Sequence, residues 1–231
     1  MKRILGIDSS VPQGSVALLE NDRILSETYF QGTANFSDGL LTMVDQVLTR
    51  SRIRLQDVDG FGITTGPGSF TGLRVGVSLV KGFVLATEKP FRGIDTLEAV
   101  SACVRPTPHP ICALLDARKK EVYCAFFKYE NHRLKRMSPD RVLPPEELVA
   151  LISEPTVFIG SGLTAYGDFL CGQLGPLFVN PAELKGHTVA ASAAFLASAG
   201  LNEKQCLDLD ELNIKYVRKS EAELNYSKKS F

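Results

Sequence analysis

The sequence lacks a net charge, because 26 lysine and arginine residues balance 26 aspartate and glutamate residues over 231 positions. A protein that binds nucleic acid or a membrane surface by itself usually carries a clear basic excess, so the composition argues against both classes. A neutral surface also does little to repel a second copy of the chain. We therefore expect the free protein to form a homodimer.

Cysteine is scarce and scattered, with five residues and no Cys-x-x-Cys pair. This usage is typical of a reduced intracellular protein and argues against a disulfide framework or a zinc site. The apolar run that starts at Ile4 stops at Asp8, which is too short for an export signal. The longest uncharged stretch, residues 186–202, is rich in Ala and Ser and predicts a buried helix instead of a membrane span. We expect a soluble, cytoplasmic protein with no membrane partner.

Recognisable catalytic motifs are also missing. The three histidines, His109, His132 and His187, show neither His-x-x-x-His nor His-Glu-x-x-His spacing, which argues against a metal site. Ser69 and Ser161 lie beside glycines but lack the Gly-x-Ser-x-Gly pattern of a hydrolase nucleophile. The sequence therefore predicts no metal, no cofactor and no catalytic residues, and it leaves a hydrolase without support.

What the sequence does contain is two similar halves. The first half predicts a βββαβαβα order of elements. The expected strands are 3–9, 15–20, 23–30, 58–64 and 91–94, and the expected helices are 35–50, 69–87 and 96–103. A stretch with Pro106, Pro108 and Pro110 then marks a hinge. The predicted division is a first lobe at 1–105 and a second, degenerate lobe with a C-terminal tail at 106–231.

The second half repeats the plan at a shift of about 108 positions. This shift places the strand that ends at Asp8 on the strand that ends at Asp116, and the next strand follows without a gap. The later elements come in a matching order, with a helix at 145–152, a strand at 156–159 and helices near 164–171 and 188–200. Such a repeat predicts an α/β protein with a two-lobed actin-like (ribonuclease-H-like, ASKHA) fold, built from tandem βββαβαβα lobes.

The turn after the first strand is a candidate degenerate nucleotide or docking site, made of Asp8, Ser9 and Ser10. In actin-like ATPases this hairpin cradles phosphate through backbone N–H groups, and the aspartate lies near magnesium. Here Ser10 stands where a glycine would let phosphate approach, and Asp8 can instead cap the turn through its own backbone. The equivalent turn of the second half offers Asp116 and Arg118, either as a local ion pair or as an acid–base pair.

The most distinctive segment is Gly-Pro-Gly-Ser-Phe-Thr-Gly-Leu-Arg at residues 66–74. It lacks the lysine of a P-loop and the spacing of a dinucleotide loop, so a tight turn capped by Ser69 explains it better than an anion site. Gly72 and Gly76 then lie about one turn apart in the helix, where each glycine costs about 1 kcal/mol relative to alanine. This cost indicates that another backbone comes close, either that of the protein's own sheet or that of a partner helix.

The partner-helix alternative makes helices 35–50 and 69–87 half of a four-helix interface. Both helices carry apolar stripes that such a contact would cover. The candidate interface residues are Leu40, Met43, Val44, Val47, Gly72, Leu73, Val75, Gly76, Leu79 and Phe83.

Three segments, residues 4–10, 66–76 and 116–123, together resemble the TsaB (YeaZ) family, and the resemblance in length and element order covers essentially the whole chain. Membership implies a non-catalytic relative of TsaD that is required for threonylcarbamoyl modification of the tRNA adenosine beside the anticodon. It also implies pairing with a TsaD-like transferase subunit through the first-lobe helices and recruitment of a TsaE-like ATPase. On this view the protein meets tRNA only through the complex.

The chain departs from the family pattern at two places. Phe36 stands where many relatives have histidine, which further argues against a metal site. The usual Pro-x-Tyr-x-Arg near the C-terminus reads Ile214-Lys215-Tyr216-Val217-Arg218, which leaves the role of this segment open. Two alternatives from other classes remain: a stand-alone actin-like ATPase or kinase that uses Asp8, and a glycopeptidase-like hydrolase.

Overall fold

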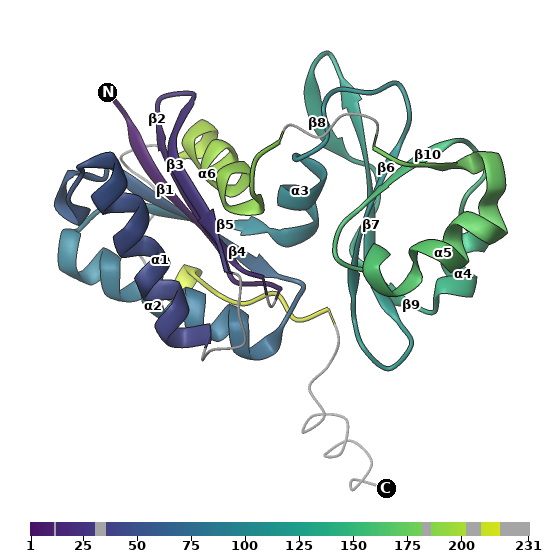
Figure 1. The fold of residues 1–231 in the computed structure, drawn as a ribbon, viewed down its shortest axis with the longest axis horizontal. Helices are drawn as coiled ribbons and strands as arrows, with labels where there is room; N and C mark the ends of the chain where they lie inside the picture. The colour runs from purple at the N-terminus through teal and green to yellow at the C-terminus, as the bar shows by residue number, and fades with distance from the viewer. Residues whose placement is uncertain (12, 31–35, 182–185, 202–208, 218–231) are drawn as a thin grey trace, which may run out of the picture.

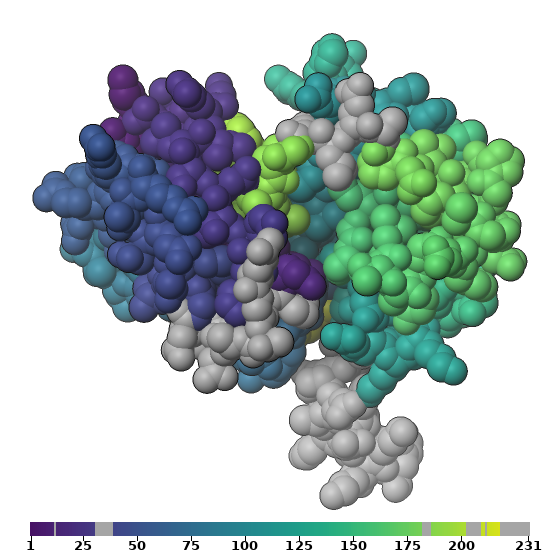
Figure 2. Space-filling view, viewed as in Figure 1, coloured from purple at the N-terminus to yellow at the C-terminus, as the bar shows by residue number. Residues whose placement is uncertain are grey.

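The computed structural model of the chain describes residues 1–11, 13–30, 36–181, 186–201 and 209–217. Two twisted sheets lie side by side, each with helices packed against it (Figure 1). Figure 2 shows that the surface is hollowed along the line where the two lobes meet. The βββαβαβα order of elements is present in the first half, and the second half repeats it with one extra short strand before its first helix, so the predicted tandem α/β fold is confirmed.

The first sheet has the strand order β3-β2-β1-β4-β5, in which β2 is antiparallel to its neighbours and β4 and β5 continue in parallel. Strands β1 and β2 are buried almost throughout because helices cover both faces of the sheet, and they are correspondingly apolar. The elements are β1 (Arg3–Asp8), β2 (Ser15–Glu20), β3 (Arg23–Tyr29), α1 (Phe36–Ser51), η1 (Leu55–Asp57), β4 (Gly60–Gly66), α2 (Phe70–Thr87), β5 (Phe91–Asp95) and α3 (Thr96–Ser101).

The second sheet has the order β11-β10-β6-β7-β8, with the short β9 paired to the start of β7. Helices α4 and α5 cover its outer face through an apolar cluster that includes Leu148, Phe158 and Leu170. The elements are β6 (Ile111–Asp116), β7 (Val122–Glu130), β8 (Arg133–Arg136), β9 (Arg141–Leu143), α4 (Pro145–Ala150), β10 (Thr156–Ile159), α5 (Leu163–Leu174), η2 (Gly175–Leu177), β11 (Phe178–Val179), α6 (Val189–Gly200) and η3 (Leu209–Glu211).

The internal repeat holds for the first strand of each lobe and slips by one residue at the second. Strands β1 and β6 correspond at a shift of 108, since Arg3–Asp8 matches Ile111–Asp116. Leu5 lies opposite Leu18 in the first sheet, whereas its counterpart Ala113 lies opposite Ala125. The prediction of a gapless match is therefore wrong, because the turn at 117–121 is one residue shorter than the turn at 9–14.

The two lobes exchange a helix. Helix α3 follows the first sheet in sequence, yet Leu97 and Val100 pack into the apolar cluster of the second sheet. Helix α6 follows the second sheet, yet it lies on the first sheet, where a Cβ on Gly6 would be 2.0 Å from the carbonyl oxygen of Ala190 (Figure 1). The alanine-rich sequence of α6, together with glycine in β1, permits this close approach.

The last described segment also returns to the first lobe. Leu212 is buried in the core beneath α1 and α2, and Ile214 packs against the same cluster. The backbone N–H of Lys215 donates to the carbonyl oxygen of Thr65 at 2.8 Å. The predicted second lobe at 106–231 is therefore too long, because α6 and residues 209–217 complete the first lobe. Residues 218–231 of the predicted tail lie outside the described residues.

Candidate functional site

Asp8 ends β1, and its carboxylate is buried in the first lobe. Its Oδ1 accepts hydrogen bonds from the backbone N–H of Ser10 (3.0 Å), from Ser10 Oγ (2.6 Å) and from Thr64 Oγ1 (2.7 Å). Burial raises the pKa of Asp8, and these three hydrogen bonds offset part of that effect. The carboxylate thus caps its own turn with neutral donors of the same chain, as the turn-capping alternative expects.

The turn after Asp8 rests directly on the first turns of α2. Ser69 is the N-cap of α2, with its Oγ accepting from the N–H of Gly72, and its own N–H donates to the carbonyl oxygen of Ser10 at 2.7 Å. A Cβ on Gly72 would lie 2.2 Å from the carbonyl oxygen of Ser9, and one on Gly76 would lie 2.1 Å from Ser9 Oγ. The two glycines therefore make room for the protein's own hairpin, and the partner-helix reading of Gly72 and Gly76 is wrong.

Most of the predicted interface residues face the interior of the first lobe. An apolar stripe at helical spacing is what any helix presents to the sheet it covers, and here the sheet is the chain's own. The buried residues of the predicted set are Leu40, Met43, Val44, Val47, Gly72, Leu73, Gly76 and Phe83. Val75 and Leu79 are half buried, so for these two an interface role stays a prediction. The side chain of Phe36 lies outside the described part of the structure.

The side of α2 turned away from the sheet, which we call the outer face, consists of Val75, Ser78, Leu79, Gly82 and Leu85. Val75 and Leu79 lie at its edges and also pack against the first core. Leu85 is 72% exposed, and a Cβ on Gly82 would meet no atom within 4 Å. These positions fall within about a third of the helical circumference, so they form one continuous strip. Among the described helices, α2 is long and apolar enough by composition to span a bilayer, but its other side is packed in the first lobe.

The second turn holds a local ion pair. Asp116 Oδ1 accepts from the backbone N–H of Arg118 at 2.8 Å, and Arg118 Nη1 lies 3.2 Å from Asp116 Oδ2. The Arg118 side chain is 78% exposed, which fits the ion-pair alternative better than an acid–base pair. Arg118, Lys119 and Lys120 all have positive φ, between 53° and 61°, so this turn displays three cations on a left-handed backbone.

The C-terminal segment contacts the start of α2 through an aromatic cluster that the sequence did not predict. The ring centroids of Phe70 and Tyr216 are 5.3 Å apart, and the Arg74 guanidinium lies 3.6 Å above the Phe70 ring. Ile214, in place of the usual proline, packs against the first core. Arg218 lies beyond the described residues. The distinctive segment 66–74 thus also anchors the end of the chain.

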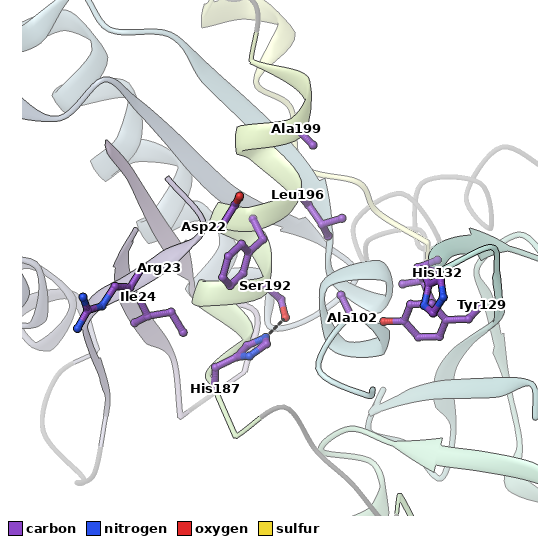
Figure 3. Close-up of a pocket in the computed structure, with 12 residues that line it drawn as sticks. Asp22, Arg23, Ile24, Ala102, Tyr129, His132, His187, Ser192, Leu196 and Ala199 are labelled. Carbon is purple, nitrogen blue, oxygen red and sulfur yellow. Dashed lines mark hydrogen bonds between the residues drawn. The ribbon is translucent and has the colours of Figure 1, made fainter. Parts of the chain in front are cut away.

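Sequence reasoning also missed a pocket of about 620 Å³ between the lobes (Figure 3). His132 and His187 line it, although no motif links them. On its α6 side, His187 Nε2 lies 2.9 Å from Ser192 Oγ, and Ser192 Oγ lies 3.3 Å from Cys103 Sγ. No signal in the sequence could have revealed this pocket, because its lining comes from four separate stretches of the chain.

Comparisons with known proteins agree with this architecture. A family model described as TsaD, tRNA N6-adenosine threonylcarbamoyltransferase, matches residues 24–224. The tRNA threonylcarbamoyladenosine biosynthesis protein TsaB of Escherichia coli is 33% identical over 172 residues, covering 72% of this chain and 74% of that protein. The TsaB of Bacillus subtilis is 27% identical over 96% of this chain and 97% of its own length. The solved structure of YeaZ from Pseudomonas aeruginosa superimposes with a TM-score of 0.73 at 24% identity, covering 94% of this chain and all of that one.

The tandem sheets, the exchanged helices and the family match define a two-lobed actin-like protein related to TsaD. Within that class, the chain belongs to the TsaB (YeaZ) family. The resemblance seen in the three sequence segments is thereby confirmed.

Proposed function

We propose that the protein is a non-catalytic scaffold and activating subunit for the threonylcarbamoyl modification of the tRNA adenosine beside the anticodon. In this proposal it works in the cytoplasm, pairs with a TsaD-like transferase subunit, helps to recruit a TsaE-like ATPase and meets tRNA only through the complex. The names of its TsaB relatives, all of them tRNA threonylcarbamoyladenosine biosynthesis proteins, support the pathway.

The non-catalytic role is supported by the packing of the β1–β2 turn against the start of α2. Ser9 and Ser10 occupy the turn that an actin-like ATPase uses for phosphate, and Ser9 fills the space beside Gly72 and Gly76 of α2. The Asp8 carboxylate, which would otherwise lie near a metal, already accepts from Ser10 and Thr64. A nucleotide would have to displace buried contacts of the chain itself, which costs free energy that its binding must first offset.

The pairing role is supported by the outer face of α2. Its apolar and small side chains would let another helix approach closely, and the gap at Gly82 leaves room for a partner's side chain. Leu41 of the neighbouring helix α1 is 52% exposed and adds apolar surface to the same lobe. We propose that one face serves both the TsaD-like partner and a second copy of this chain.

The test is co-purification and light scattering with a TsaD-like protein, using two leucine variants. Gly82→Leu places a side chain on the outer face, whereas Gly172→Leu places one on α5, where a Cβ also meets nothing within 4 Å. We expect Gly82→Leu to weaken both association with the partner and self-association by about 10- to 100-fold, while Gly172→Leu changes neither. Equal affinity of both variants would remove the outer face from the proposal. Tight nucleotide binding by the isolated protein would favour the ATPase or kinase alternative.

A further inference from the structure

The pocket between the lobes lies away from both candidate turns. It is lined by the β2–β3 turn, by Ala102 at the end of α3, by the β7–β8 turn and by residues in and just before α6. Strands β2 and β7 carry the turns at 9–14 and 117–121 at their other ends, so the pocket is at the opposite end of both sheets from those turns. It is therefore separate from the place where an actin-like protein would hold nucleotide phosphate. The lining residues are Asp22, Arg23, Ile24, Ala102, Tyr129, His132, Leu134, His187, Ser192, Phe195, Leu196 and Ala199.

The size and the lining of the pocket suit a small organic ligand. Its volume of about 620 Å³ falls within the range of roughly 300–1,000 Å³ that is typical of small-molecule sites. Rings come from both lobes: Tyr129 and His132 from the second, and His187, whose centroid is 5.8 Å from that of Phe195, from the first. A planar aromatic ligand could contact ring faces on both sides of the lobe boundary.

The charges around the pocket indicate an uncharged ligand. Among the described lining residues, Asp22 and Arg23 carry full charges of opposite sign on the same turn, and both are exposed. A charged ligand would thus find no excess of opposite charge around the pocket, and burying its charge against the apolar lining would be costly in free energy.

The polar groups favour a ligand that donates a hydrogen bond. Tyr129 Oη donates its proton to the carbonyl oxygen of Val104 at 2.9 Å, so this hydroxyl does not offer that proton to a ligand. Ser192 Oγ contacts His187 Nε2 and Cys103 Sγ, and when it donates to one and accepts from the other, one acceptor position is left. In Figure 3 the side chains of Ser192 and His187 point toward each other at the wall of the pocket.

We propose that this pocket binds a small, uncharged, planar aromatic molecule that donates an N–H hydrogen bond to Ser192. The ligand contacts both lobes at once. This site is independent of the proposed role in tRNA modification, and its test does not use that activity.

Indole is a suitable probe, because the chain contains no tryptophan and the fluorescence of added indole is not masked by the protein's own. We expect saturable binding of one indole per chain with a submillimolar dissociation constant. Indene has the same shape without the N–H, and indole-2-carboxylate adds a negative charge. Each should bind to the protein about tenfold more weakly than indole does. Absence of saturable binding, or equal binding of the three compounds, would overturn the proposal.

Two variants locate the site. Ala199→Phe fills the pocket from an exposed helical position, and Ala150→Phe is a matched change on the exposed side of α4. We expect the first to weaken indole binding at least tenfold and the second to leave it unchanged. Ser192→Ala should lower the affinity for indole to that for indene while leaving indene binding as it was. Equal binding by the Ala199→Phe and Ala150→Phe variants, or unchanged indole selectivity in Ser192→Ala, would contradict the assignment.

Discussion

Arg136 Nη2 in the second lobe lies 2.6 Å from Asp95 Oδ1 in the first, and this ion pair joins the two sheets at the end of β5. Lys215 of the C-terminal segment extends the link, with its Nζ 2.8 Å from Asp95 Oδ2 and 2.5 Å from Asp140 Oδ2. Burial opposes the charged form of Asp95, but the hydrogen bond from Lys215 and the charge of Arg136 outweigh it and hold the pKa of Asp95 below its ordinary value. The four residues thus form a balanced network of two acids and two bases between the lobes.

The first prediction concerns the strength of this link. A double-mutant cycle with Asp95→Asn and Arg136→Met should give a coupling energy of about 0.5–3 kcal/mol, because both side chains are largely shielded from water. The control cycle uses Arg54 and Asp57, an exposed pair at 2.9 Å, for which we expect about 0–1 kcal/mol. Urea unfolding measures both. Equal coupling energies in the two cycles would show that the lobes are not held by this network.

A second prediction compares two glycines of the same helix. Gly72→Ala should destabilise the fold by about 1–3 kcal/mol, because its Cβ would press on the backbone oxygen of Ser9. Gly82→Ala should instead stabilise it by up to about 1 kcal/mol, since the position is open and alanine favours the helix. Thermal unfolding followed by circular dichroism distinguishes the two. If both changes stabilise the protein, the turn after Asp8 does not rest on α2 in solution.

The third prediction concerns pH. The pKa of Asp8 in the folded state is raised above its ordinary value of 3.8. At a pH between 3.8 and the raised pKa, the folded state therefore keeps a proton on Asp8 that the unfolded state has released. The contribution of Asp8 to stability therefore falls as the pH rises through this window. Asp8→Asn removes this dependence while keeping an oxygen acceptor for Ser10 and Thr64. The stability of the variant relative to the unmodified chain should increase as the pH rises above 3.8, as measured by urea unfolding at a series of pH values. A constant difference over this range would argue against a raised pKa.

The left-handed turn of the second lobe gives the fourth prediction. Lys120 has a φ of 61°, a conformation that costs a residue with a Cβ roughly 1–2 kcal/mol. Lys120→Gly should therefore stabilise the protein by up to about 1 kcal/mol after the greater freedom of glycine in the unfolded chain is counted. Lys128→Gly, in the interior of β7, should destabilise it by about 0.5–1 kcal/mol. Loss of stability in both variants would mean that this turn does not adopt the left-handed conformation.

Local patterns predicted the local structure well. Alternating and continuous apolar runs located the strands around Ile4 and Ile111, and Ser69 marked the start of α2 as an N-cap. The same patterns could not tell which surface a helix covers, because burial against the chain's own sheet and burial against a partner require the same stripe. Gly72 illustrates this limit, since its spacing indicated a close contact but not that the contact is Ser9.

Features that depend on distant parts of the chain were beyond the sequence. The pairing of Asp95 with Lys215 joins residues 120 positions apart, and the pocket brings Asp22 near His187. Neither has a fixed spacing or a motif, since both arise from the way the lobes and the returning segment are placed. The placement of α6 on the first sheet has the same origin.

The exchange of α3 and α6 has a consequence for how the chain is made. The first sheet is covered on one side by a helix that begins at Val189, so a ribosome has synthesised most of the protein before that side can be closed. Until then the apolar face of β1 and β4 is exposed to water and to other nascent chains, and α3 lacks its sheet as well. Such long-range contacts slow folding and favour association of incomplete chains. We therefore expect that the two halves, expressed as separate polypeptides, become soluble only when they are produced together.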